Sequence, residues 1–207
     1  MTERKIAMGK LDGTNPNHPK KGSRITVNPI RAEKNIKKIK RLLKDNARDL
    51  LLFTMGINNG LRISDLLKLK VGDVRDIKPG QILKVKETKT GKMNILMINK
   101  SVHKVLKQYL EEVNPSGEDY LFQSRNGNNK PLARETVNKM IKEWTKSLKG
   151  NYGTHTLRKT FGYIQRTKYG VSFEVLCKRF GHSSPVITMR YLGIDDKEVA
   201  GILINEI

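Results

Sequence analysis

Several features are scarce in this sequence of 207 residues, and each absence excludes something. Cys177 is the only cysteine, which rules out an intrachain disulfide and a cysteine-rich zinc site and is typical of a reducing cytoplasm. We interpret it as a buried thiol in a helix. No apolar run approaches the roughly 20 residues of a membrane-spanning helix, and the N-terminal stretch MTERKIAMGK lacks the apolar core of a signal peptide. We therefore expect a cytoplasmic protein with no membrane partner.

Acidic residues are also few. Asp and Glu number 20 against 41 Lys and Arg, which gives a formal net charge of +21. Such an excess indicates a polyanionic partner. Nucleic acid is favoured over a membrane surface, because no long basic amphipathic helix stands alone. With 37% hydrophobic residues, the chain is long enough to bury one sizeable core, so we expect one principal domain.

One boundary divides the chain, close to residue 29. Residues 1–28 are rich in Gly, Pro, Asn and Lys and poor in large apolar residues, so we interpret them as a basic flexible arm. After the boundary, Ile36, Ile39, Leu42 and Leu43 recur at helical spacing and predict an amphipathic helix. The other face of this helix carries cations that we regard as DNA-binding candidates: Lys34, Lys37, Lys38 and Arg41.

The remaining pattern predicts a mainly α fold with a small antiparallel β-sheet. A helix through LLLFTMGI ends at Asn58-Asn59-Gly60, and Ser64 begins a short helix that reaches Leu69. Residues 82–86 and 93–98 predict two strands joined across KTGK, with a weaker strand at 120–122. Further helices are expected over 101–113, 134–148, 154–168, 172–180, 184–192 and 195–207.

The segment THTLR places His155 and Arg158 three residues apart at a predicted helix start, with Thr154 as its cap. Side chains at this spacing share a helix face. A guanidinium beside an imidazole suits an oxyanion such as phosphate. A histidine and an arginine at this spacing are also common on ordinary surfaces, so the segment alone does not decide the function.

Two further segments carry candidate residues. GLRISDL places Arg62 between a glycine and a helix start, where it is either solvated or paired with Asp65. GHSSPVITMRYLG places His182 and Tyr191 nine residues apart, with a turn and then a helix between them. Taken by itself, Tyr191 is better explained as a partly buried tyrosine on an apolar helix face.

Together these segments resemble the tyrosine recombinase family, the phage integrases, in residue type, order and approximate spacing over about residues 30–207. GLRISDL resembles the family's first arginine motif, and ETKTGK resembles its hairpin lysine, with Lys89 in the preferred register and Lys92 in the alternative one. THTLR is similar to its His-x-x-Arg box, and GHSSPVITMRYLG supplies a second histidine and the nucleophile. The catalytic residues that the resemblance implies are Arg62, Lys89, His155, Arg158, His182 and Tyr191, while Lys92 joins the DNA-binding candidates.

The resemblance implies a site-specific recombinase that cleaves and rejoins double-stranded DNA through a covalent 3′-phosphotyrosine. It implies a homo-tetramer on DNA, accessory DNA-bending proteins as further partners, and a bacterial or phage-encoded, nucleoid-associated protein. No metal or nucleotide cofactor is expected, since two arginines can clamp the phosphate. Residues 29–207 would form the catalytic domain, with no separate N-terminal core-binding domain. The chain is then either a catalytic fragment or a short member that resembles the fimbrial-switch inverting recombinases.

In the mechanism that the resemblance implies, Tyr191 attacks phosphorus, Lys89 protonates the departing 5′ oxygen, His155 serves the tyrosine's proton and His182 donates to the phosphate. Gly181 is expected to permit a tight approach. The amphipathic segment 195–207 either closes the chain's own core or docks on a neighbouring protomer. Two alternatives stay open: a type IB-like topoisomerase, and a DNA-binding module without independent recombination activity.

Overall fold

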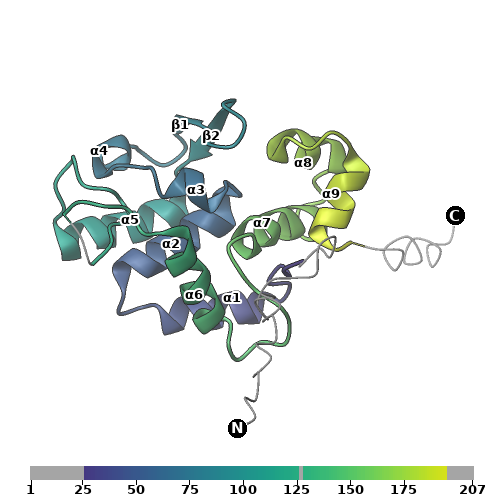
Figure 1. The fold of residues 1–207 in the computed structure, drawn as a ribbon, viewed down its shortest axis with the longest axis horizontal. Coiled ribbons are helices and arrows are strands. Elements are labelled where there is room, and N and C mark those ends of the chain that lie inside the picture. The colour runs from purple at the N-terminus through teal and green to yellow at the C-terminus, as the bar shows by residue number, and fades with distance from the viewer. Residues whose placement is uncertain (1–25, 126–127, 195–207) are drawn as a thin grey trace, which may run out of the picture.

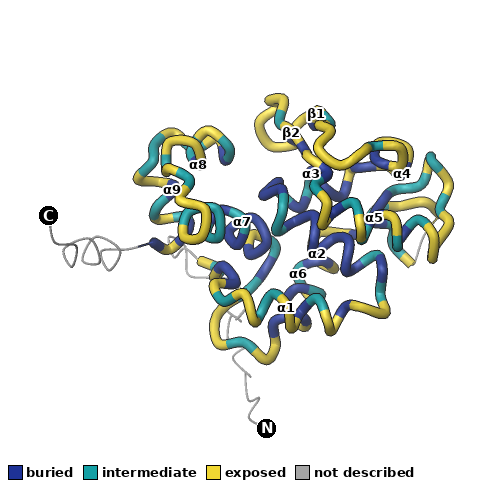
Figure 2. The backbone as a smooth tube through the Cα atoms, turned by 180° about the vertical axis from the view of Figure 1, so that it is seen from behind, coloured by how far each residue is buried: buried dark blue, intermediate teal, exposed yellow. Residues whose placement is uncertain are grey.

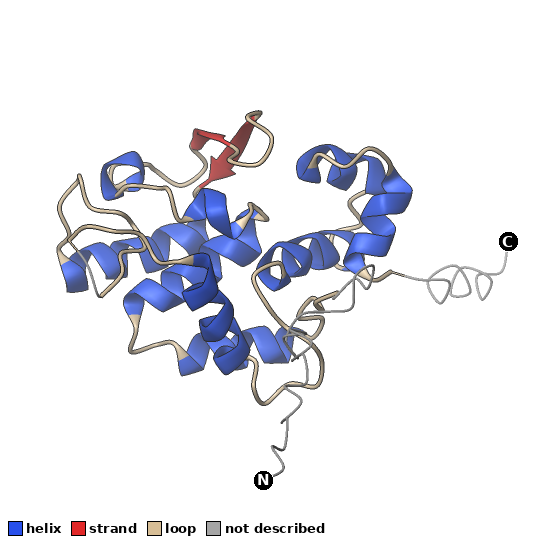
Figure 3. Cartoon of the chain, in the orientation of Figure 1, coloured by secondary structure: helices blue, strands red, loops and turns tan. Residues whose placement is uncertain are grey.

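The computed structural model describes residues 26–125 and 128–194. The predicted mainly α fold with a small antiparallel sheet is confirmed (Figures 1 and 3). The predicted arm, apart from residues 26–28, and the predicted helix over 195–207 lie outside the described residues. The elements within those ranges are α1 (Glu33–Leu42), α2 (Ala47–Asn59), α3 (Ile63–Leu66), α4 (Val71–Val74), β1 (Ile82–Lys86), β2 (Met93–Met97), α5 (Lys100–Val113), α6 (Arg134–Trp144), α7 (Thr156–Thr167), α8 (Phe173–Phe180) and α9 (Pro185–Leu192).

Helix α2 is the centre of the main core. Its segment from Leu50 to Met55 is apolar apart from one threonine and buried throughout, as expected for a helix that is covered on every side. Helices α5 and α7 pack against it. Gly56 lets α7 come close, because a Cβ at this position would lie 2.6 Å from Cδ1 of Leu157. None of the helices in the described ranges is long and apolar enough to cross a bilayer.

Helix α1 is amphipathic, as predicted. Ile39 and Leu43 are buried and Ile36 is half-buried, but Leu42 is 62% exposed. The prediction was wrong for Leu42 because the helix ends there, and Leu43, four residues after Ile39, takes the place on the buried side. The four cations predicted on the opposite face are all exposed.

A second, smaller cluster of buried side chains lies at the C-terminal end of the described chain. Helices α8 and α9 pack against each other, and α9 packs against α7. Gly162 of α7 makes room for this contact, because a Cβ there would lie 2.6 Å from the Phe180 ring. Figure 2 shows the buried backbone gathered around α2 and sparse around α8 and α9. The buried members of this cluster are Leu176, Phe180, Leu192 and Ile194.

The sheet is a single antiparallel hairpin, from Ile82 opposite Met97 to Lys86 opposite Met93. The third strand expected at 120–122 was wrong. Its backbone groups are used elsewhere, since the N–H of Leu121 donates to the carbonyl oxygen of Leu69, 2.8 Å away. Only isolated bridges form in that region of the described chain.

The region after α2 also differs from the prediction. Helix α3 begins at Ile63 rather than Ser64 and lasts a single turn. A further short helix, α4, follows and was not predicted. Asp73 stabilises its start by accepting a hydrogen bond of 2.7 Å from the backbone N–H of Lys70.

Candidate active site

Arg62 follows the sharp end of α2. Gly60 has a φ of 61°, in the left-handed region that favours glycine at a helix end, and Arg62 then becomes the N-cap of α3. Arg62 Nη1 lies 2.7 Å from Oε2 of the buried Glu87. Asp65 is not its partner, because Asp65 Oδ1 accepts a hydrogen bond of 2.8 Å from the backbone N–H of Thr88. The pair with Asp65, one of the two ordinary roles left open for Arg62, therefore does not form.

Lys89 lies at the tip of the β1–β2 hairpin. Thr88, Lys89 and Thr90 form the turn, and Gly91, with a φ of 68°, donates its N–H to the carbonyl oxygen of Glu87 at 2.9 Å. The Lys89 side chain is exposed and lines the same cleft as Arg62.

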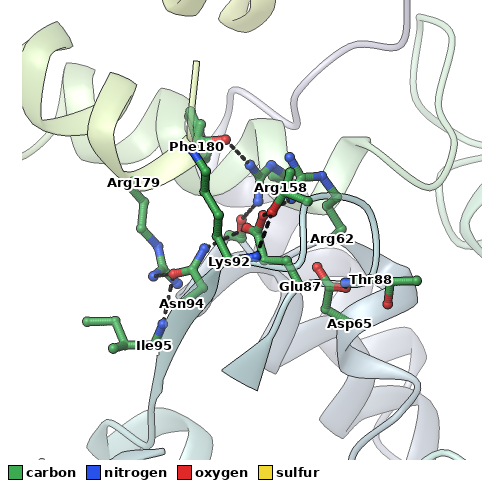
Figure 4. Close-up of polar contacts among 12 residues, drawn as sticks. Arg62, Asp65, Glu87, Thr88, Lys92, Asn94, Ile95, Arg158, Arg179 and Phe180 are labelled. Carbon is green, nitrogen blue, oxygen red and sulfur yellow. Dashed lines mark hydrogen bonds and ion pairs between the residues drawn. The ribbon is translucent and has the colours of Figure 1, made fainter. Parts of the chain in front are cut away.

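Arg158 is buried on the first turn of α7, with only 3% of its surface exposed. Its Nη1 donates to the carbonyl oxygen of Gly60 at 2.7 Å, and its Nη2 donates to that of Phe180 at 2.8 Å. Figure 4 shows the Arg158 side chain beside that of Arg62. Burial lowers the pKa of Arg158, but a guanidinium stays charged in proteins. Arg158 therefore connects the end of α2 to the end of α8.

His155 occupies the N-cap position of α7, so the predicted cap at Thr154 is wrong. The local turn is held by Thr156 instead, whose hydroxyl accepts a 3.0 Å hydrogen bond from the backbone N–H of Gly153. The His155 ring lies beside Tyr191, with 3.3 Å between Nδ1 and the phenolic oxygen.

The loop between α8 and α9 carries His182. Gly181 ends α8 with a φ of 65°, but no described atom lies within 4 Å of a Cβ built there. Within the described protein the glycine serves the left-handed turn, and the tight approach expected there toward DNA stays a prediction. His182 Nδ1 lies 3.0 Å from the hydroxyl of Thr188. Ser184 caps α9 and Pro185 is its first residue, as predicted.

Tyr191 lies on the last turn of α9 and is half-buried. Its ring centre is 5.5 Å from that of Phe180 and 5.1 Å from that of His182. Burial raises the pKa of Tyr191 to about 12, although the positive charge of Arg158 opposes that rise. The phenol therefore keeps its proton at neutral pH and needs a base in order to act as a nucleophile.

His155 can be that base. The residue as a whole is exposed, but loss of water around the imidazole, and then the charges of Arg134 and Arg158, lower its pKa to about 4. The imidazole is then neutral at pH 7, and Nδ1 can accept a proton from the Tyr191 hydroxyl.

A cleft of about 380 Å³ lies beside this pair and is lined by Arg62, Lys89, His155 and Arg158, among others. Its walls carry a high density of positive charge, which suits a phosphodiester. Within the described ranges, no three His, Cys, Asp or Glu side chains are grouped so that they could hold a metal ion. The polar residues that line the cleft include Arg62, Lys89, Arg134, His155 and Arg158.

The model of the phage integrase family matches residues 29–198. This chain belongs to the phage integrase family. Its fold and its relatives make it a tyrosine recombinase catalytic domain.

Two relatives of the chain illustrate its range in the family. It is 40% identical over 174 residues to the probable integrase/recombinase YoeC of Bacillus subtilis. The aligned region covers 82% of this chain and 91% of YoeC. It is 30% identical over 168 residues to the tyrosine recombinase XerA of Pyrococcus horikoshii. Here the aligned region covers 81% of this chain and 57% of XerA. The chain therefore spans nearly all of YoeC but little more than half of XerA.

Solved structures show the same fold. The XerA recombinase superposes with a TM-score of 0.71 at 22% identity, over 90% of this chain and 68% of that one. XerH bound to palindromic difH substrate, in a post-cleavage complex, superposes with a TM-score of 0.68 at 24% identity. The match covers 87% of this chain and 53% of XerH. A lambda integrase tetramer bound to a Holliday junction superposes with a TM-score of 0.59 at 19% identity. The match covers 82% of this chain and 49% of the integrase chain.

Four of the six predicted catalytic residues line the cleft: Arg62, Lys89, His155 and Arg158. Tyr191 reaches it through its contact with His155. The sixth, His182, lies against Tyr191. Lys92 is exposed at the foot of the hairpin loop and is not among the residues that line the cleft. Helix α1, which carries the other four candidates, lies at the end of the molecule remote from the hairpin (Figures 1 and 2). The role of these cations in DNA binding stays a prediction.

Sequence reasoning missed four residues around the site. Arg134 lines the cleft, and the Nζ of Lys159 lies 4.9 Å from the centre of the Tyr191 ring. Glu87 pairs with Arg62. Arg179 reaches across to β2, where it donates to Asn94. Lys159 follows Arg158 directly and was open to notice, but the other three depend on contacts between distant segments. Cys177, expected to be buried, is half-buried on α8 and donates to the carbonyl oxygen of His182.

Proposed function

We propose that this chain cleaves and rejoins double-stranded DNA at a specific site, through a covalent bond between Tyr191 and the 3′ phosphate. The observation that carries the proposal is the 3.3 Å contact between the Tyr191 hydroxyl and Nδ1 of His155, beside a cation-rich cleft. A DNA-binding module would need the arginines but would have no use for a base beside a tyrosine.

In the cleavage step, the phenolic oxygen of Tyr191 attacks phosphorus and its proton passes to Nδ1 of His155. The bond between phosphorus and the 5′ oxygen breaks, and Lys89 protonates that oxygen as it leaves. The bond energy is kept in the phosphotyrosine, so the reverse attack by a 5′ hydroxyl rejoins the strand without a nucleotide cofactor.

Charge stabilisation in this step falls to the two arginines. The guanidinium groups of Arg62 and Arg158 supply fixed positive charge where the nonbridging oxygens gain negative charge. The Nδ1 of His182 meets the hydroxyl of Thr188. In the tautomer in which Thr188 donates, Nε2 carries the proton and is available to an oxyanion.

The working assembly is proposed to be a tetramer on two duplexes. This rests on the solved structures with the same fold, which include a recombinase bound to its DNA substrate and a lambda integrase tetramer on a Holliday junction. Opposite charges support the DNA partner independently, since the chain carries a net charge of +21.

The test is a covalent-capture assay on a pool of nicked duplexes with randomised cores. A nick lets the short 5′-hydroxyl strand diffuse away, so the protein–DNA adduct accumulates and survives denaturation. We expect an adduct in EDTA with the native chain and none with Tyr191→Phe. An adduct that persists in Tyr191→Phe would refute the assigned nucleophile. Tight binding without any adduct would support a DNA-binding module instead.

A further inference from the structure

Glu87 is the meeting point of three segments of the site. Its carboxylate is buried, with 6% of the residue exposed. Oε2 lies 2.7 Å from Nη1 of Arg62 and accepts a 2.6 Å hydrogen bond from the hydroxyl of Thr90. Oε1 accepts a 2.7 Å hydrogen bond from the side-chain amide of Asn94. Figure 4 shows the Glu87 side chain reaching from the hairpin toward the two arginines.

The same residue closes the hairpin loop that carries Lys89. The backbone N–H of Glu87 donates to the carbonyl oxygen of Lys92, and its own carbonyl oxygen accepts from the N–H of Gly91, both at 2.9 Å. The two neighbours of Lys89 are also held: the Thr88 N–H by Asp65, and the Thr90 hydroxyl by Glu87. The loop is therefore fixed on both sides of an exposed lysine.

A second arginine extends the connection to the segment of His182. Arg179, on the last turn of α8, donates through Nη1 to Oδ1 of Asn94 and through Nε and Nη2 to the carbonyl oxygen of Asn59. Asn94 thus accepts from Arg179 with its oxygen and donates to Glu87 with its amide nitrogen. The chain of contacts runs from α8 through β2 to Arg62.

The charge state of Glu87 supports a built connection. Burial works against ionisation of this carboxyl, but hydrogen bonds from Thr90 and Asn94, together with the charge of Arg62, hold its pKa at about 2. Each of these donors offsets part of the cost of burying the charge, and losing one of them leaves polar groups unpaired.

We propose that Glu87, with Asn94 and Arg179, is a positioning network that holds the Lys89 hairpin at the phosphate clamp. It touches no reacting atom and acts through Lys89, whose hairpin it ties to Arg62. A general acid on a hairpin tip works only when its ammonium group stays near the leaving oxygen, and a misplacement of about 1 Å costs on the order of 10²-fold in rate. This inference rests on the proposed function, in which Lys89 is that acid.

The test compares two substrates built on a sequence recovered from the nicked pool. One carries the natural 5′ oxygen and the other a 5′ sulfur at the scissile bond. A thiolate leaves without a proton, because a thiol has a pKa of about 8.5, so a defect in general acid placement should disappear with sulfur. A merely structural defect would persist with both substrates.

With the oxygen substrate, we expect Glu87→Gln and Asn94→Ala to slow single-turnover cleavage on the order of 10²-fold. With sulfur, both should return to within about 3-fold of the native chain, following the Lys89→Ala reference, while Arg179→Lys should show a smaller defect that sulfur also relieves. Glu118→Gln, which removes a carboxylate from the exposed pair with Lys70, is the matched control and should change neither rate.

Equal slowing of Glu87→Gln on both substrates, or cleavage faster than native, would overturn the network while leaving the proposed function intact. The second result would mean that Glu87 instead occupies the place of the phosphate and restrains Arg62. The proposed function would fail separately, if Lys89→Ala were not relieved by sulfur or if the native chain formed no adduct.

Discussion

The two halves of the active site rest on very different foundations. Arg62 and the Lys89 hairpin stand on the main core around α2, which includes buried residues from α1 to α7. His182 and Tyr191 stand on the α8–α9 cluster, whose described buried members number only four. The phosphate clamp is therefore built on rigid packing, and the nucleophile on a small unit attached to it. A small unit opens locally at lower free energy than a large core does.

Arg158 lies at the seam between these halves. One nitrogen of its guanidinium donates to a carbonyl oxygen at the end of α2, and another to a carbonyl oxygen at the end of α8. The residue proposed to bind the phosphate also joins the clamp half to the nucleophile half. The comparison thus predicts that changes at the seam cost most, changes within the small cluster cost less, and surface charges least.

Arg158→Lys should have the largest effect. Lysine keeps the charge but cannot reach two carbonyl oxygens with a planar fork. We expect cleavage to fall about 10³-fold, the upper range for loss of one oxyanion donor, because both charge placement and the joint are lost. Single-turnover adduct formation measures this, with the exposed Lys104→Arg on α5 as the control. A loss below about 10-fold would mean that the fork is dispensable.

Phe180→Ala tests whether the two halves open independently. Removing a buried phenylalanine costs about 3–5 kcal/mol, and here the small cluster should bear it. We expect faster amide hydrogen exchange in α8 and α9 with little change in α2. Phe53→Ala, which cuts into the main core, should instead lower the melting temperature of the whole chain. Identical exchange patterns in the two variants would refute the division.

The contrast also explains what the sequence could reveal. The spacing of apolar residues and the residues that end each element located the hairpin and α2. For α2, an apolar run that ends in Asn-Asn-Gly is best explained as a helix with its C-terminal cap. The roles of Arg62 and Tyr191 came from the resemblance to the tyrosine recombinases, which rests on the order and spacing of several motifs. The positioning network was out of reach, because a glutamate beside two lysines in a hairpin looks solvated, and its partner Arg62 is distant in sequence. Arg179, next to Lys178, likewise looked like an ordinary basic surface.

Arg134→Ala sharpens the extent of the clamp half. Arg134 lines the cleft, and if it contacts a DNA phosphate, its removal should lower the slope of log binding constant against log salt by about 0.9. Fluorescence anisotropy at several salt concentrations measures the slope. Lys38→Ala applies the same measurement to the exposed face of α1. An equal decrease of the salt slope in this variant would mean that the bound DNA extends to α1. The exposed Lys104→Ala on α5 is the control. An equal decrease of the salt slope in that variant would mean that the slope follows the total charge of the protein and not a contact made by Arg134.

The smallest effect concerns acid stability. The folded-state pKa of His155 is about 4, below its ordinary 6.5, so the unfolded chain binds more protons between these values. Stability should therefore be fully present above pH 6.5 and decline as pH falls toward 4. His155→Gln should flatten the decline of the melting temperature between pH 6.5 and 5, a window in which Glu87, with a pKa of about 2, stays ionised. The pKa of His182 is also lowered, so His182→Gln should likewise flatten the decline of the melting temperature. An unchanged decline in both variants would show that neither ring is dehydrated enough to resist protonation, and would remove the reason for treating His155 as the neutral acceptor of the Tyr191 proton.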